Sequence, residues 1–332
     1  MGRHVRAGGK TLTLLGTPRT FLILRSLGEG TKCQLDLRRD AGFPAQSTLR
    51  GHLASLEKAG IVVKQRRDVF PGAFEYDLTD LGCELLTVAR GVERWLATAP
   101  HGPLELGSDP AKAAIKGLAE SWTATVLSAL ADGPLTLTEL DKRIVAVSYP
   151  TIERCLQTMH LAEQLEIGPR SSRGTPYAIT DWLRHGLAPL AHAARWEHRH
   201  RADGAAAVDH LDIADALMLS APLFDLPGRL SGICQLAVGD PHGSAKDRRL
   251  GYIEVRRREL SYGEAYPEIK PDAWASGTVD SWFATVIDTN PDSLKLSGDQ
   301  DLALAIFERL HKALFASAAR EQATVAEPQP QG

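Results

Sequence analysis

The sequence repeats one pattern at a separation of about one hundred residues. The LGEG of residues 27–30 matches the LADG of residues 130–133 at an offset of 103. Further along, the YDLTD of residues 76–80 matches the YAITD of residues 177–181 at an offset of 101, so the second copy is two residues shorter between these motifs. Because an internal repeat marks one structural unit used twice, we expect two like modules in the first two thirds of the chain.

Apolar periodicity predicts the same elements in each copy: three helices, a β-hairpin and a further helix. In the first copy we expect helices at residues 21–27, 32–40 and 45–59, strands at 61–69 and 73–78, and a last helix at 80–97. In the second copy we expect helices at 122–131, 137–144 and 149–163, a hairpin around 170–174, and a helix from 181 to about 200. This order is that of a winged helix, whose third helix enters the major groove of DNA while the hairpin, or wing, lies along the backbone.

Three motifs of the first copy carry a family resemblance: LGEG at 27–30, the leucine-rich segment 49–61, and FEYDLTDLG at 74–82. Together they resemble the HxlR-type branch of the MarR-like bacterial transcription regulators. The second copy, with ESWTATVLSAL, LTELDKRI and YAIT, is a more divergent match, and the resemblance covers roughly residues 15–198. It implies a regulator that binds double-stranded DNA. Members of that family are typically homodimeric one-domain proteins, so the fused tandem departs from the family pattern and leaves a possible homodimer open.

Positive charge is concentrated in the first third of the chain. Residues 1–100 carry 15 Lys and Arg against 10 Asp and Glu, residues 101–200 carry 10 against 11, and residues 201–332 carry 13 against 20. We therefore expect a polyanion to bind the first copy.

DNA contacts need cations for phosphates and polar side chains for base edges. In the first copy the candidates on the third helix and the wing are Gln46, Ser47, Thr48, Arg50, His52, Lys64, Arg66 and Arg67. In the second copy they are Ser148, Tyr149, Thr151, Arg154, Arg170 and Arg173. The second copy either contacts another half-site or serves as a scaffold that partners the first. The N-terminal Arg3, Arg6 and Lys10 fit a minor-groove arm and a disordered segment equally well.

The last third alternates strand-like and helix-like patterns, and its SLKLSGDQDLALAIFERL, preceded by a helix with a polar cap, resembles the sterol-carrier-protein-like fold. That resemblance covers about residues 208–316 and implies an α/β module with an apolar tunnel. The predicted fold is mainly α with β-hairpin wings, in two tandem winged-helix domains, plus a C-terminal α/β sterol-carrier-like domain. The boundaries are a basic arm at 1–14, winged helices at 15–100 and 108–202, the sterol-carrier-like domain at 205–316, and a disordered tail at 317–332.

Apolar residues of the last third are candidates for a ligand cavity, although each of them also fits an ordinary core position. They are Leu217, Met218, Phe224, Trp274, Trp282, Phe283 and Val286. We expect a ligand-responsive transcription regulator whose last domain senses a hydrophobic small molecule. The alternative is a carrier or sequestering protein for a hydrophobic natural product or lipid.

Other classes of function lack support in the sequence. The four cysteines form no CxxC pair, which argues against a zinc site or a disulfide framework. No nucleophile motif or glycine-rich phosphate loop is present, so we expect neither an enzyme nor a cofactor. No run of about 18 apolar residues occurs, and the start has no adequate apolar segment for a secretory signal, so we expect a cytoplasmic protein without membrane contact.

Overall fold

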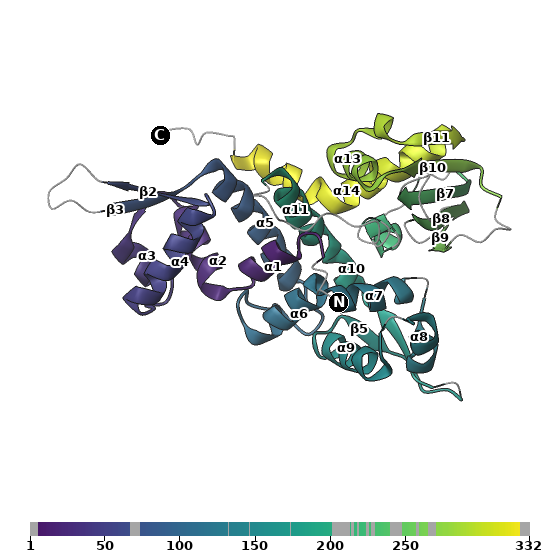
Figure 1. The fold of residues 1–332 in the computed structure, drawn as a ribbon, viewed down its shortest axis with the longest axis horizontal. Helices are drawn as coiled ribbons and strands as arrows, with labels where there is room; N and C mark the ends of the chain where they lie inside the picture. The colour runs from purple at the N-terminus through teal and green to yellow at the C-terminus, as the bar shows by residue number, and fades with distance from the viewer. Residues whose placement is uncertain are drawn as a thin grey trace.

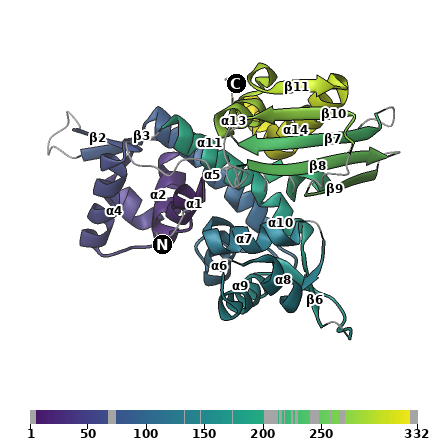
Figure 2. The same cartoon turned by 45° about the vertical axis from the view of Figure 1, so that its right-hand side comes forward.

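The computed structural model describes residues 6–66, 74–131, 133–145, 147–172, 174–200, 230–239, 248–256, 259–264 and 270–325, together with short stretches between 213 and 226. The chain is arranged as two helix-rich modules and a sheet domain, which meet along a central group of helices (Figure 1). The hairpins of the two modules extend from opposite sides of this centre (Figures 1 and 2).

The first module follows the predicted element order, with one additional helix at its start. It contains α1 (Gly9–Leu15), α2 (Pro18–Leu27), β1 (Lys32–Cys33), α3 (Gln34–Asp40), α4 (Gln46–Lys58), β2 (Val62–Arg66), β3 (Phe74–Leu78) and α5 (Asp80–Ala97). Proline at the first position of α2 suits a helix start, and the Thr79 hydroxyl caps α5 by accepting from the Gly82 N–H. The strands form an antiparallel sheet in the order β1-β3-β2.

The second module contains α6 (Asp109–Ala119), α7 (Ser121–Leu130), β4 (Leu135–Thr136), α8 (Leu137–Arg143), α9 (Tyr149–Leu161), β5 (Leu165–Ile167), β6 (Pro176–Ile179), α10 (Asp181–His185) and α11 (Leu187–Arg199). Its sheet has the order β4-β6-β5, so the middle strand is again the last in sequence. The expected helix from 181 to 200 is divided into α10 and α11 at Gly186.

The structure differs from the expected basic arm over residues 6–14. Arg6 is 3% exposed, and α1 buries Leu12 and Leu15. The Glu197 carboxylate on α11 accepts hydrogen bonds from the backbone N–H groups of Gly8 (2.9 Å) and Thr11 (2.8 Å). An anionic partner at the free N–H groups of a helix start is favourable. Residues 6–14 are therefore docked on α11, which leaves only the exposed Lys10 accessible among the described basic residues of this segment.

The two modules contact each other through α5, α10 and α11, where tryptophans form matching bonds. The rings of Trp95 and Trp182 stack with centroids 4.7 Å apart. Trp95 Nε1 donates to the Trp182 carbonyl (2.8 Å), and Trp182 Nε1 donates to the Trp95 carbonyl (2.9 Å). In addition, Trp196 Nε1 donates to the Leu81 carbonyl (3.1 Å). In the repeat predicted from the sequence, with its 101-residue offset, Trp196 aligns with Trp95 and Trp182 aligns with Leu81, so the bonds from Trp95 and Trp196 join aligned positions in opposite directions.

The C-terminal domain is a five-stranded sheet covered by helices (Figure 2). Its elements include β7 (Gly232–Gly239), β8 (Arg248–Arg256), β9 (Glu259–Glu264), β10 (Ala273–Gly277), α13 (Val279–Asp288), β11 (Lys295–Gly298) and α14 (Gln300–Val325), with strand order β11-β10-β7-β8-β9. All neighbouring strands are antiparallel except β10 and β7, which are parallel. Helix α14 also packs against α11. Helix α11, which belongs to the second module, therefore contacts both the first module and the sheet domain.

The expected disordered tail is partly helical, because α14 continues to Val325. Alanine-rich residues 316–325 have high helix propensity, which accounts for the extension. Residues 326–332 lie outside the described part. No helix within the described residues is long and apolar enough to cross a membrane.

Candidate nucleic-acid interface

Helix α4 has one buried and one exposed face. Leu49, Leu53 and Leu56 recur at helical spacing and are all at most 3% exposed, which fixes the orientation of the helix in the module. The other face carries the predicted base-contacting residues: Gln46, Ser47 and Arg50 are exposed, and Thr48 and His52 are half-buried. The predicted set on this helix therefore lies on the outer side or at its border.

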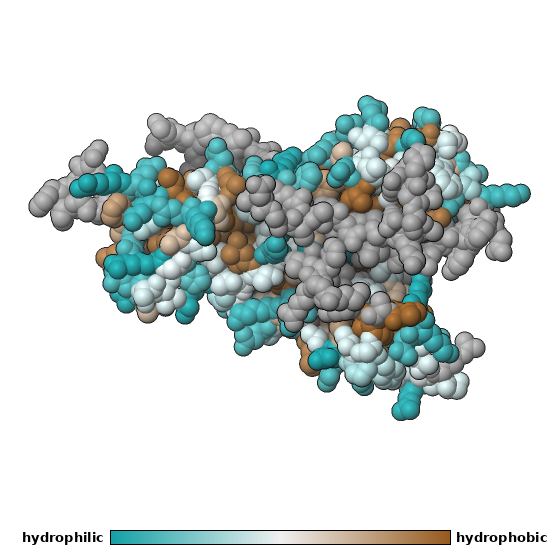
Figure 3. Space-filling view, viewed as in Figure 1, coloured by the Kyte–Doolittle hydropathy of each residue, from teal (hydrophilic) through white to brown (hydrophobic). Residues whose placement is uncertain are grey.

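The wing presents cations beside that helix. Lys64 and Arg66 are exposed on β2, and the Lys64 ammonium lies 4.0 Å from the centroid of the Phe74 ring on β3. This cation–π contact restrains the lysine on one side of the hairpin. The third predicted wing cation, Arg67, lies outside the described residues. Figure 3 shows hydrophilic side chains over much of the α3–α4 end of the module.

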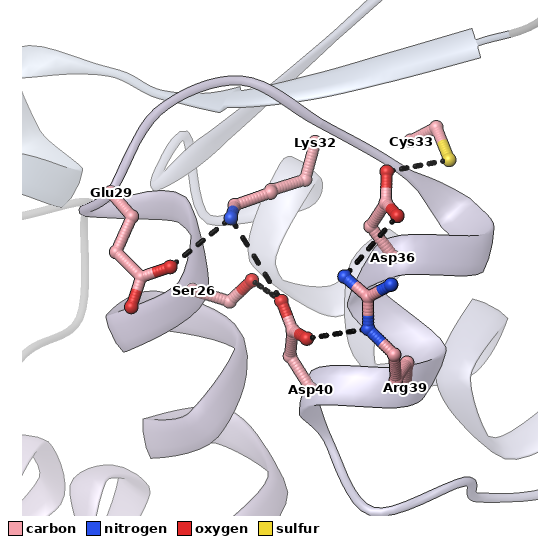
Figure 4. Close-up of polar contacts among 7 residues, drawn as sticks. All are labelled: Ser26, Glu29, Lys32, Cys33, Asp36, Arg39 and Asp40. Atoms are coloured by element: carbon pink, nitrogen blue, oxygen red, sulfur yellow. Dashed lines mark hydrogen bonds and ion pairs between the residues drawn. The ribbon is translucent and has the colours of Figure 1, made fainter.

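A polar network joins α2 to α3 and positions the turn before α4 (Figure 4). The Ser26 hydroxyl donates to Asp40 Oδ2 (2.6 Å), and this bond is the largest cause of a lowered pKa for the Asp40 carboxyl. Lys32 lies 3.1 Å from Glu29 and 4.0 Å from Asp40, while Arg39 pairs with Asp36 (3.5 Å) and Asp40 (3.3 Å). This network was not predicted from the sequence, although the i,i+3 spacing of Asp36 and Arg39 was a signal for part of it.

The turn between α3 and α4 exposes an aromatic ring that was likewise not predicted from the sequence. Gly42 and Phe43 both have positive φ, 78° and 53°, and the Phe43 side chain is 67% exposed. The turn is held by hydrogen bonds from the Phe43 N–H to the Arg38 carbonyl (2.8 Å) and from Arg38 Nε to the Pro44 carbonyl (3.1 Å). A large residue in the left-handed region is costly, so this exposed ring is maintained at the expense of backbone strain.

The surface predicted to contact DNA in the second module has different contacts. Tyr149 and Arg154 are exposed on α9, and Arg170 is exposed after β5. The Ser148 and Thr151 hydroxyls lie 2.9 Å apart and bond each other at the start of the helix. Arg173 lies outside the described residues.

The predicted ligand-binding residues that the structure describes lie mainly in the core of the sheet domain. Trp282 is fully buried and donates from Nε1 to the Ala237 carbonyl (2.8 Å), with the Phe307 ring edge-on at 5.4 Å. Phe283 faces His198 of α11, with ring centroids 4.5 Å apart. Leu217 and Val286 are also buried, and Trp274 on β10 is half-buried. Met218 and Phe224 lie outside the described residues.

The described residues were also compared with the arrangements that metal ions and reactive thiols need. No group of three or more His, Cys, Asp or Glu there is arranged to hold a metal ion. The four cysteines are unpaired, and burial raises the pKa of the Cys234 thiol to about 12. Such a thiol stays protonated and unreactive near neutral pH.

Comparison with known proteins identifies the first module. Residues 14–101 match the family described as HxlR-like helix-turn-helix. No curated protein matches the chain. Among solved structures, the crystal structure of diamide-treated YodB from B. subtilis matches with 28% sequence identity, over 26% of this chain and 85% of that chain, at a TM-score of 0.25.

Proposed function

We propose that this protein is a transcription regulator that binds duplex DNA through α4 and the β2–β3 wing of its first module. The observation that carries the proposal is the pairing, on an HxlR-like helix-turn-helix domain, of an exposed polar helix face with adjacent wing cations. Domains of this family are typical of DNA-binding transcription regulators.

In the proposed complex the two surfaces have different roles. Gln46 and Arg50 approach base edges in the major groove, where Gln suits adenine and Arg suits guanine. Lys64 and Arg66 neutralise phosphates along the neighbouring backbone, and Arg67 is the third cation assigned to this role. The Ser26–Asp40 network and the turn at Phe43 hold the segment that precedes α4.

The second module takes the place of a dimer partner in this proposal. We assign it as a divergent duplicate of the first winged helix, supported by the shared strand order and by the matching bonds from Trp95 and Trp196. An isologous dimer contact is made twice, once in each direction, and these two bonds have that character within one chain. In this proposal a single chain therefore presents two winged-helix modules to DNA.

We also propose that the sheet domain senses a hydrophobic small molecule. The residues proposed to contact it are Leu217, Met218, Phe224, Trp274, Trp282, Phe283 and Val286. Helix α11 would transmit a ligand-induced change from the sheet domain to the first module, because it packs on α14 as well as on α5 and α1. A ligand that prefers one arrangement of these helices by about 1 to 3 kcal/mol changes DNA affinity about 5- to 150-fold.

Selection of duplexes from a random pool tests the DNA-binding part. The wild-type protein should enrich a defined sequence, and Gln46→Ala/Arg50→Ala should lose preference at the bases those residues read. Lys112→Ala/Lys116→Ala on α6, which also removes exposed cations, should enrich the wild-type sequence. If the wild-type protein enriches nothing, or if both double variants behave alike, the proposal is wrong.

A further inference from the structure

The net charge of the segment proposed to bind DNA in the first module differs in sign from that of the aligned segment in the second. The inference drawn from this difference rests on the proposed DNA-binding function. Residues 32–67, from β1 to the wing, hold eight Lys and Arg against three Asp and Glu, a net charge of +5. The corresponding residues 135–170 hold four against five, a net charge of −1. The two segments have the same length, so the comparison is position by position.

The strand registers show that equivalent wing positions have been compared. Lys64 pairs with Tyr76 in the first sheet, and Ile167 pairs with Tyr177 in the second. Since the two tyrosines correspond in the repeat, Ile167 occupies the place of Lys64. Ile167 is 45% exposed, so a cation on the first wing has been replaced by an apolar side chain facing solvent.

Cations of α4 and of the rest of the first wing are likewise replaced by other residues in the second module. Lys58, the last residue of α4, corresponds to Leu161, the last residue of α9, which is 76% exposed. Pro169 stands where Arg66 stands in the first module, and Glu153 stands where Arg50 does. Leu161, Pro169 and Glu153 all lie on the surface, as Ile167 does.

Some positive charge remains on the second module. Arg154 takes the place of Gly51, and Arg170 takes the place of Arg67. Both side chains are exposed. These two arginines keep the surface compatible with DNA, but leucine, isoleucine and proline cannot neutralise phosphates, which is the interaction that supplies most sequence-independent affinity.

We propose that this chain recognises an asymmetric DNA site. The first module reads one half-site and makes most of the phosphate contacts, while the second module lies over the neighbouring half-site and adds little affinity or sequence preference. In this proposal the second module acts in place of a dimer partner, held to the first by the two matching tryptophan bonds, and the low charge of its residues 135–170 makes its half-site weakly held.

Returning the lost cations tests this proposal. Leu161→Lys/Ile167→Lys should bind the selected duplex more tightly than wild type, and its plot of log affinity against log salt concentration should steepen by about 1.8, which is 0.9 for each added phosphate contact. Leu250→Lys/Leu304→Lys adds the same charge at partly exposed sites of the sheet domain and should leave the slope unchanged. Thermal melting of both variants checks that they remain folded.

Several outcomes would overturn the proposal while leaving DNA binding by the first module intact. An unchanged slope for the second-module variant would mean that the second module stays away from DNA. A wild-type site with equal information in two inverted half-sites would also contradict it. Absence of any sequence-specific DNA binding by the wild-type protein would instead refute the proposed function itself.

Discussion

At the residue scale, the contact between the modules depends on side chains that are both apolar and hydrogen-bonding. Trp95 and Trp182 are 5% and 6% exposed, and each indole N–H satisfies a backbone carbonyl of the other helix segment. Sequence patterns predict that such residues are buried, but they do not pair two tryptophans 87 residues apart, because the pairing depends on how two modules dock. The predicted ligand residue Trp282 donates to the Ala237 carbonyl in the core of the sheet domain. A sequence pattern does not show this contact, because the two residues are distant in the chain.

Removing one indole N–H should destabilise the contact. In Trp95→Phe the buried Trp182 carbonyl keeps only its longer bond from the Gly186 N–H (3.3 Å), so the free energy of unfolding should fall by about 0.5 to 1.5 kcal/mol in urea titrations. Trp196→Phe removes the corresponding bond to the Leu81 carbonyl at a half-buried position, and its effect should be smaller. Equal losses in the two variants would mean that burial does not set the strength of these bonds.

His192 on α11 should make stability depend on pH. Burial lowers the pKa of its imidazole to about 4, and the nearby positive charges of Arg195, Arg94 and His311 act in the same direction. The unfolded chain therefore binds a proton below about pH 6.5 while the folded protein does not, so stability falls as the pH decreases from about 6.5 to 4.

The contribution of His192 to this loss should be at most about 3 kcal/mol. His192→Gln should remove it, so urea titrations at pH 7 and pH 4.5 should show a smaller loss of stability in the variant than in wild type. Parallel loss in both proteins would show that other groups cause the acid sensitivity.

At the element scale, the sequence predicts the helices with strong apolar periodicity and misses those that depend on distant contacts. Helices α2, α4 and α5 and both wings lie close to their predicted ranges, because a leucine stripe or an alternating strand pattern is a local signal. Helix α1 was missed because its basic, glycine-containing start resembles an arm, whereas Glu197 on α11 holds it. The turn at Phe43 was missed because strain of this kind is set by hydrogen bonds from neighbouring elements.

The docking of α1 on α11 should be sensitive to one glycine. Gly8 has φ 78°, and a Cβ there would lie 2.7 Å from the Ala194 nitrogen and the Leu190 oxygen of α11. Gly8→Ala therefore combines left-handed strain of about 1 to 2 kcal/mol with a clash against backbone. Gly42 has the same φ and no atom within 4 Å of a Cβ, so Gly42→Ala carries the strain alone.

Denaturant unfolding of Gly8→Ala and Gly42→Ala separates the two effects. The Gly8 variant should lose clearly more stability than the Gly42 variant. Similar losses would mean that α1 can shift away from α11 at little cost.

At the scale of the whole molecule, two helix-rich modules and a sheet domain share one central helix, α11. The internal repeat and the charge gradient predict two modules and a DNA surface on the first, and the structure contains two helix-rich modules with the same strand order. The DNA surface stays a prediction. How the modules dock could not be predicted, since it depends on Trp95, Trp182 and Trp196 meeting across the chain.

The measurement that tests the central claim most directly is the salt dependence of DNA binding, followed by fluorescence anisotropy. It compares wild type with the wing variant Lys64→Ala/Arg66→Ala/Arg67→Ala. The control variant, Lys270→Ala/Lys295→Ala/Lys312→Ala, removes the same charge from exposed sites of the sheet domain. Each lost phosphate contact should reduce the slope of log affinity against log salt by about 0.9, so the wing variant should bind weakly with a slope lower by up to about 2.7, and the control should match wild type. Equal slopes and affinities for all three proteins would contradict DNA binding through the first wing.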